Sequence, residues 1–96
     1  MPDPHVPVHE PERDRFSVAS EGEVAVVEYT LDAAAGVMTI THTLVPKPLE
    51  GRGIAGALVR AALDFARASG LRVHPTCSYA DAWMRRHPDY DTLRTG

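Results

Sequence analysis

Apolar and polar residues alternate along the first half of the chain in a way that predicts β-strands. Three runs rich in apolar, β-branched or aromatic residues are expected to be strands: residues 16–19, 24–31 and 37–45. The links between these runs are short and contain glycine. Short links favour pairing between neighbours, so we expect the strands to form an antiparallel meander.

The run at residues 37–45 has the clearest alternation of the three. Threonines at positions 39, 41 and 43 separate Met38, Ile40, His42 and Leu44. Successive side chains of a strand point to opposite faces of its sheet. The pattern therefore predicts that Met38, Ile40, His42 and Leu44 share one face.

A helical period replaces this alternation after Pro46 and Pro48. Apolar residues then recur at helical spacing up to about residue 69: Ile54, Leu58, Ala62 and Phe65. Gly70 is suited to end such a helix, and residues 71–74 read as a last short strand. Strand, helix and strand in this order make a βαβ unit, so we expect this strand to lie parallel to the one at 37–45.

A second and shorter helix is predicted from Tyr79 to His87, where Pro88 stops it. Its apolar stripe consists of Ala80, Trp83, Met84 and His87. Ser78, followed three residues later by Asp81, resembles a capping box. The pattern assigns no element to the last residues of the chain.

The first 14 residues differ in composition from the rest, because four prolines lie among acids and histidines. Proline has no N–H donor and restricts the residue before it, so we expect residues 1–14 to form a flexible arm. Residues 15–93 then make up one folded domain. His5 and His9 lie in the arm and are expected to be solvated. Neither they nor the later histidines form a recognisable set of metal ligands, so no metal is expected.

Composition and charge narrow the class of protein. The chain has 96 residues, enough for one domain, and its formal net charge of -3 argues against a nucleic-acid binder that neutralises phosphates. The charge is uneven, since seven arginines and only four acids follow Glu50. Cys77 is the one cysteine, no apolar run reaches the ~20 residues that cross a bilayer, and the pattern of a signal peptide is missing. We expect a cytoplasmic protein without a membrane partner.

A glycine-containing loop runs from the strand at 37–45 directly into the first predicted helix. Gly51, Gly53 and Gly56 lie in it, with Arg52 among them. The first turn of a helix has unpaired N–H groups and a partial positive charge, and glycines let an anion come close. This order predicts a pyrophosphate site. Its spacing is neither that of a P-loop nor that of a dinucleotide-binding fold, and a simple tight turn remains the alternative.

The same loop resembles a known motif. Glu50-x-x-Gly53-x-Ala55 is similar to the acetyl-CoA signature of the GNAT N-acetyltransferase superfamily, which usually reads Gln/Arg-x-x-Gly-x-Gly/Ala. Three further segments resemble the small single-domain GNAT-like subfamily: His42-Thr43-Leu44-Val45-Pro46, Pro75-Thr76-Cys77-Ser78-Tyr79 and His87-Pro88-Asp89-Tyr90. Together the matching segments extend over roughly residues 8–93.

The resemblance implies a GNAT-like α/β fold, the acyl-CoA N-acyltransferase fold, with an antiparallel meander, one βαβ crossover and a truncated C-terminal part. It also implies acetyl-CoA as co-substrate. The residues expected to bind it are Leu44, Val45, Gly51, Arg52, Gly53, Ile54, Ala55 and Gly56. The N–H of Val45 would face the thioester carbonyl. Glu50 departs from the signature, and an acid repels a pyrophosphate, so we expect its side chain outside the ligand contacts.

Two residues are candidates for the chemistry of acetyl transfer. His42 is the expected general base, because imidazole titrates near neutrality and the subfamily resemblance puts this residue at the active site. Cys77 precedes a helix, whose N-terminus favours the thiolate, and it would either attack the thioester or relay a proton. The structural alternatives are a half-buried histidine of a sheet and a small buried thiol. Tyr79 and Tyr90 are expected to be structural.

These observations favour an N-acetyltransferase whose acceptor is an amine on a small molecule or a protein. One alternative is a coenzyme A-binding module with little or no catalysis, since the small size removes acceptor-binding surface. Another is a protein-interaction domain whose glycine loop is only a turn. Hydrolysis of acyl-CoA by Cys77 is a lesser option. The chain is expected to be a monomer or a weak homodimer.

Overall fold

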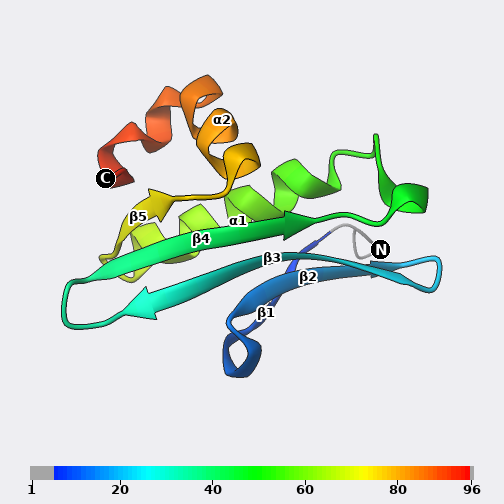
Figure 1. The fold of residues 1–96 in the computed structure, drawn as a ribbon, viewed down its shortest axis with the longest axis horizontal. Helices are drawn as coiled ribbons and strands as arrows, with labels where there is room; N and C mark the ends of the chain where they lie inside the picture. Colours follow the sequence, from blue (N-terminus) through cyan, green and yellow to red (C-terminus); the bar gives the residue numbers. More distant parts are fainter. Residues whose placement is uncertain (1–5, 96) are drawn as a thin grey trace.

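A five-stranded sheet forms the body of the molecule in a computed structural model that describes residues 6–95. Its strands lie side by side in the order of the sequence (Figure 1). They are β1 (Val8–Glu10), β2 (Arg15–Ser20), β3 (Glu23–Asp32), β4 (Val37–Leu44) and β5 (Arg72–Pro75). The first four pair antiparallel, and β5 pairs parallel with β4. The predicted meander and the parallel last strand are therefore confirmed.

Two α-helices and three short 3-10 helices complete the fold. They are α1 (Ile54–Ala68), α2 (Ser78–Arg86), η1 (Pro11–Arg13), η2 (Lys47–Leu49) and η3 (Pro88–Leu93). Helix α1 lies behind the sheet in Figure 1, while α2 and η3 lie beyond β5 and the front face carries no helix. The end of the chain, to which the sequence assigned no element, thus contains η3 with Tyr90 and Leu93 buried.

The hydrophobic core fills the space between α1 and one face of the sheet and extends to buried residues of α2 and η3. The predicted apolar stripe of α1 is buried at Ile54, Leu58 and Ala62, and Phe65 is partly buried. Gly70 follows α1 with φ of 71°, and the next amide bonds back to the carbonyl of Ala66, as expected for a glycine that ends a helix. The core faces α1 because that face of the sheet alone is covered by a helix.

A β-bulge in β4 overturns the predicted face of its second half. Tyr29 pairs with Ile40 and Glu28 pairs with His42, so Thr41 is an extra residue on β4. Glu28 and Tyr29 are consecutive residues of β3 and point to opposite faces of the sheet, so their partners His42 and Ile40 also point to opposite faces. Met38 and Ile40 face α1, whereas His42 and Leu44 lie on the open face and are exposed. The prediction that all four share one face was wrong.

The predicted flexible arm is in part a strand. Residues 8–10 pair with β2, and His9 stacks on Phe16 with 4.1 Å between ring centroids. The His9 ring also lies 4.5 Å from the ring of Phe65 on α1, and its Nε2 bonds the hydroxyl of Tyr29. Prolines flank this segment without interrupting it, and prolines are tolerated at the ends of an edge strand. Residues 1–5, including His5, lie outside the described residues.

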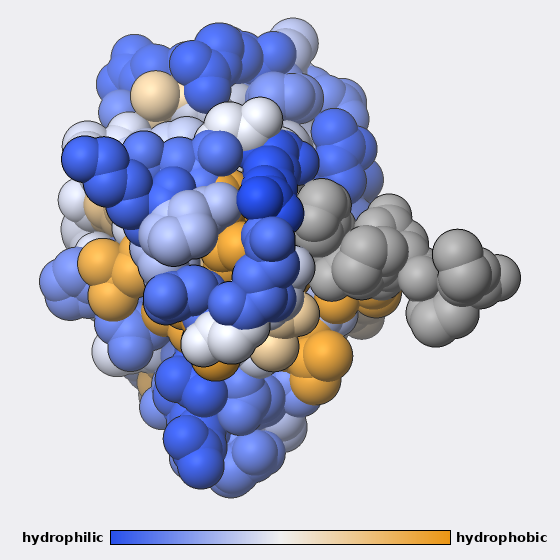
Figure 2. Space-filling model, turned by 90° about the vertical axis from the view of Figure 1, so that its right-hand side faces the viewer, coloured by the Kyte–Doolittle hydropathy of each residue, from blue (hydrophilic) through white to orange (hydrophobic). Residues whose placement is uncertain are grey.

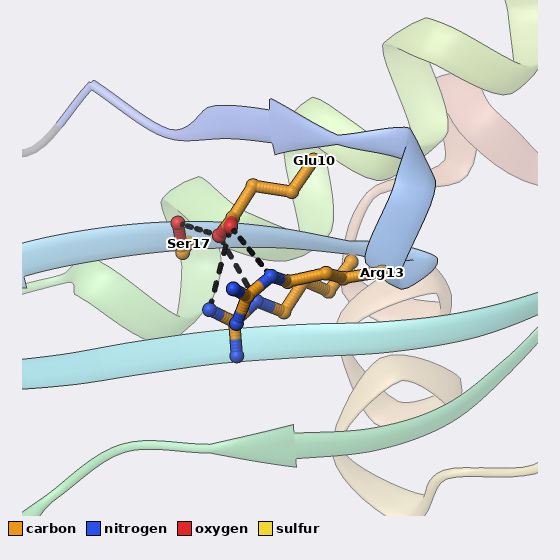
Figure 3. Close-up of polar contacts among 4 residues, drawn as sticks. Glu10, Arg13 and Ser17 are labelled. Carbon is orange, nitrogen blue, oxygen red and sulfur yellow. Dashed lines mark hydrogen bonds and ion pairs between the residues drawn. The ribbon is translucent and has the colours of Figure 1, made fainter.

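A cluster of polar side chains fastens β1 to the open face of β2 (Figure 3). The Glu10 carboxylate accepts a 2.6 Å hydrogen bond from the Ser17 hydroxyl and a 2.9 Å bond from Arg15, and Arg13 lies 3.7 Å away. The bond from Ser17, followed by that from Arg15, holds the pKa of Glu10 below its ordinary value of 4.5. Charge and hydrogen bonding therefore keep this short edge strand on the sheet.

The beginning of α2 does not form the predicted capping box. Cys77, not Ser78, is the N-cap residue, and no side chain caps the helix. The Asp81 carboxylate instead bonds Arg94 at 2.7 Å and Arg85 at 3.0 Å. Arg94 comes from the end of the chain, which the local pattern around Ser78 could not anticipate. Asp81 thereby ties α2 to the C-terminal segment.

Candidate active site

The parallel strands β4 and β5 separate at the edge of the sheet where the site lies. Their pairing ends at Ile40 and Pro75, while β4 continues to Leu44. At this point the carbonyl of Ile40 accepts three hydrogen bonds, from the amides of Thr76 and Cys77 and from the Thr76 hydroxyl, at 3.1, 3.0 and 3.0 Å. These bonds turn the chain away from β4, so the last residues of β4 present a free edge beside the start of α2.

A pocket of about 270 Å³ lies between the loop after β4, the first turn of α1 and the first turn of α2. It is lined by Val45, Leu49, Glu50, Gly51, Gly53, Ile54, Ala55, Gly56 and Tyr79. Figure 2 views the end of the molecule that carries this loop, and apolar side chains are visible there among hydrophilic ones. The pocket is thus mostly apolar and backbone-lined, in a hydrophilic surrounding.

Two glycines give the loop its shape. Gly51 and Gly53 have φ of 77° and 76°, a conformation that residues with a side chain rarely adopt, and a Cβ built on either would meet nothing within 4 Å. Gly53 is also the N-cap of α1, whose first helical hydrogen bond runs from the Ala57 amide to the Gly53 carbonyl. The backbone amides that come before Ala57 in the first turn of α1 have no intrahelical partner, and their residues line the pocket. They suit an anionic group.

Six of the eight residues predicted to bind the co-substrate line this pocket, and two do not. Leu44 lies on the open face because of the bulge, with 53% of its surface exposed. Arg52 forms an ion pair with Glu21, at the turn between β2 and β3. Glu50, whose side chain we expected outside the ligand contacts, is among the residues that line the pocket. The two charged residues of the loop therefore differ in position: Arg52 pairs with Glu21, and Glu50 belongs to the pocket lining.

Cys77 lies at the second helix N-terminus of the site. As the N-cap of α2 it is partly buried, and its Sγ is 3.4 Å from the Thr43 hydroxyl. Thr43 pairs with Val27 and so lies on the α1 side of β4, beyond the bulge. The thiol is thereby held against the free edge of β4, at the position predicted for it near the splayed strands.

His42 lies on the other face of β4. Its side chain is 66% exposed, and its Nδ1 is 3.7 Å from a carboxylate oxygen of Glu28. Within residues 6–95 no hydrogen bond joins His42 to Cys77; the structure gives each a different partner. The two candidates flank the same strand edge from opposite sides.

Three residues of the site were not anticipated as functional. Tyr79 lines the pocket, whereas the sequence predicts a structural role for it. Thr43 and Glu28 contact Cys77 and His42, and no sequence signal identified them, because the bulge that places them cannot be read from alternation. Tyr90 is structural as expected: it is buried and its hydroxyl donates to Asp64 at 2.7 Å. Burial first, and then this hydrogen bond, raises the pKa of Tyr90.

Neither a metal centre nor a membrane-spanning helix is found in the described part of the chain. Across residues 6–95, no three His, Cys, Asp or Glu side chains are grouped so that they could hold a metal ion. The helices of the same residues are too short or too polar to cross a bilayer.

A mixed sheet whose parallel strands splay beside a glycine loop at a helix N-terminus defines a class of protein. A model of the family described as GCN5-related N-acetyl-transferase matches residues 15–93. The chain belongs to this family, and the family resemblance inferred from the sequence is confirmed.

The chain is similar to several individual proteins. Protein NATD1 of Mus musculus is 36% identical over 84 residues, which cover 83% of this chain and 74% of the mouse protein. Protein NATD1 of Homo sapiens is 34% identical over 84 residues, covering 83% and 72%. The NMR structure of a GCN5-like protein from Staphylococcus aureus aligns with a TM-score of 0.73 at 22% identity, covering 94% of this chain and 87% of that one. The predicted GNAT-like fold is thus confirmed.

Proposed function

We propose that the chain binds acetyl-CoA and transfers its acetyl group to an amine. The observation that carries this proposal is the pocket at the start of α1, where the glycine loop and the first helical turn meet Tyr79. Unpaired amides and a helix dipole suit the pyrophosphate, and the apolar lining suits a pantetheine arm. The free edge of β4 leads from this pocket to Cys77.

Two routes connect this arrangement to acetyl transfer. In the first, the Cys77 thiolate attacks the thioester carbonyl carbon, the carbon–sulfur bond to coenzyme A breaks, and coenzyme A leaves as a thiolate that takes up a proton. A neutral amine then attacks the acetyl carbon, gives its proton to His42, and releases the Cys77 thiolate. In the second, the neutral amine attacks the thioester carbonyl carbon directly and gives its proton to His42. The carbon–sulfur bond then breaks, and Cys77 relays a proton to the departing coenzyme A thiolate.

The acceptor is proposed to approach from the open face of the sheet. His42 lies there beside Glu28, which would orient the imidazole and attract a positively charged amine. A primary amine of a small molecule or of a protein has the required chemistry. The protein is proposed to act in the cytoplasm as a monomer or a weak homodimer.

One observation favours a second function, a coenzyme A-binding module with little catalysis. His42 and Cys77 lie on opposite sides of β4 and have different partners. A module of this kind would bind the ligand at α1 without turnover. Binding and turnover must therefore be measured separately.

The test is a calorimetric titration of the protein with acetyl-CoA and with desulfo-CoA. The proposal expects saturable one-to-one binding of both, because desulfo-CoA keeps the phosphates and lacks only the reactive sulfur. Release of free coenzyme A thiol in the presence of a panel of amines then measures turnover. Binding without thiol release would favour the module, and no binding of either ligand would reject the coenzyme A site.

A further inference from the structure

Helices α1 and α2 meet along a seam that begins at the pocket. A Cβ built on Gly56 would lie 3.2 Å from the indole nitrogen of Trp83 and 3.7 Å from the Tyr79 hydroxyl. Tyr79 and Gly56 line the pocket. One turn further along α1, about 6 Å, Arg60 lies over the Trp83 ring at 5.3 Å. Beyond the pocket, the contact between the two helices therefore contains an arginine stacked on an indole ring.

Arg60 differs from most other arginines of the described residues. Hydrogen bonds or ion pairs engage Arg13, Arg15, Arg52, Arg67, Arg72, Arg85 and Arg94, and the structure gives none for Arg60 or Arg86. Asp64, one turn beyond Arg60, accepts the Tyr90 hydroxyl. Arg60 is exposed, and a long helical side chain leans toward the N-terminus of its helix. Its guanidinium lies over the Trp83 ring and, at 6.0 Å, the Tyr90 ring, and its N–H groups have no hydrogen-bond partner in the described residues, so they can bind an anion.

The charges near the pocket leave room for a cation on α1. Glu50 lines the pocket, and Glu21 neutralises Arg52. The helix N-terminus can serve one anionic group, the pyrophosphate, because its effect fades within the first turn. Coenzyme A carries a second anionic group, the phosphate on its ribose, at some distance from the first. An unpaired guanidinium one helical turn from the pyrophosphate site matches that arrangement.

We propose that Arg60 binds the 3′-phosphate of coenzyme A and makes the site select coenzyme A over 3′-dephospho-coenzyme A. The inference rests on the proposed function, since it places the ligand's pyrophosphate at the start of α1. Stacking on Trp83 holds the planar guanidinium in place, and its remaining N–H groups are directed to the phosphate oxygens.

The test compares the affinities of coenzyme A and 3′-dephospho-coenzyme A by calorimetry. The wild-type protein is expected to prefer coenzyme A by about fivefold to tenfold, the scale of a partly exposed charge-assisted contact. In Arg60→Gln this preference is lost through weaker binding of coenzyme A alone, and Arg60→Lys retains part of it. Arg67→Gln is the matched control, because Arg67 lies on the same helix, stacks on Tyr90 at 4.6 Å and is further from the pocket.

The outcomes separate this inference from the function on which it rests. Equal binding of the two ligands by the wild-type protein, or equal weakening of both in Arg60→Gln, overturns the role of Arg60 and leaves the coenzyme A site standing. Loss of selectivity in Arg67→Gln as well would show that helix charge in general is responsible and would also overturn it. If neither ligand binds the wild-type protein, the proposed function fails and takes this inference with it. Thermal unfolding of each variant verifies that it is folded.

Discussion

The two α-helix N-termini of this molecule both border the site, but they differ in what surrounds them. Helix α1 begins at Gly53, in a left-handed conformation, with open space around it. Helix α2 begins at Cys77, whose amide bonds the Ile40 carbonyl and whose thiol contacts Thr43. Neither helix has a side-chain cap. One N-terminus is left free for a ligand, while the other is tied to β4 and holds a thiol.

The comparison indicates that ligand binding and the chemical step depend on different parts of the site. The ligand end is built mainly by the contiguous residues 45–56, so its shape depends on local backbone conformation. The chemical end is built by β3, β4 and α2, so it depends on the register of the sheet. Changes at the first end should affect affinity, and changes at the second should affect turnover.

The largest expected effect is at the start of α2. In the acetyl-cysteine route, Cys77→Ala lowers turnover by about a thousandfold or more, because no other thiol can carry the acetyl group. Acetyl-CoA affinity stays within about twofold, since binding is assigned to α1. Thiol release and calorimetry measure the two quantities. Unchanged turnover would show that Cys77 is a packing residue. A loss of acetyl-CoA affinity would contradict the assignment of binding to the start of α1 alone.

A smaller effect, confined to binding, is expected at the start of α1. Ala55→Asp places a carboxylate in the first turn, where the helix dipole tolerates it, and repels the pyrophosphate. We expect about a hundredfold loss of acetyl-CoA affinity, about 3 kcal/mol, with the fold retained. Gly53 is less suitable for this test, because its φ of 76° would strain any side chain.

Ala57→Asp is the matched control for Ala55→Asp. It adds the same charge to the same helix end at a residue that does not line the pocket. Calorimetry should show a much smaller loss than for Ala55→Asp. Equal losses in the two variants would contradict the placement of the pyrophosphate.

The smallest expected effect is on thermal stability, through the ion pairs that hold α2 to the C-terminal segment. Hydrogen bonds from Arg94, and then from Arg85, hold the pKa of Asp81 below its ordinary value of 3.8. The stabilisation is therefore complete above that value and is lost as the pH falls through the lower pKa of the folded protein. Asp81→Asn should melt a few degrees below wild type at neutral pH, and the difference should shrink in acid.

Glu10→Gln is the companion variant for Asp81→Asn. The pKa of Glu10 is lowered as well, by the hydrogen bond from Ser17 and then by that from Arg15. The stabilisation that Glu10 gives the folded protein should therefore also be lost as the pH falls. Because Glu10 lies on β1, acetyl-CoA affinity and turnover should not change. Thermal melting between pH 2 and 7 measures the stabilities, and a melting difference for Asp81→Asn that persists at the lowest pH would contradict the assignment.

Local patterns in the amino-acid sequence are enough to predict strands β2 to β5, the first helix and the glycine loop. Runs of β-branched residues, the helical recurrence from Ile54 and the glycines around Arg52 are local signals, and backbone preference and solvent exclusion act on them locally. The strand–loop–helix order therefore indicated the glycine loop, and six of the eight residues expected to bind the co-substrate line the pocket there. It also predicted a thiol at the start of the second helix, because a short apolar stripe follows Cys77 directly.

The positions of side chains from separate segments depend instead on long-range contacts of the fold. The bulge at Thr41 moved His42 to the open face, since one extra residue reverses all later side chains of a strand. Arg52 pairs with Glu21 and does not line the pocket, and the His9 ring stacks on Phe16 and bonds the Tyr29 hydroxyl. These outcomes depend on partners far along the chain, and neither alternation nor spacing records which partners a fold brings together.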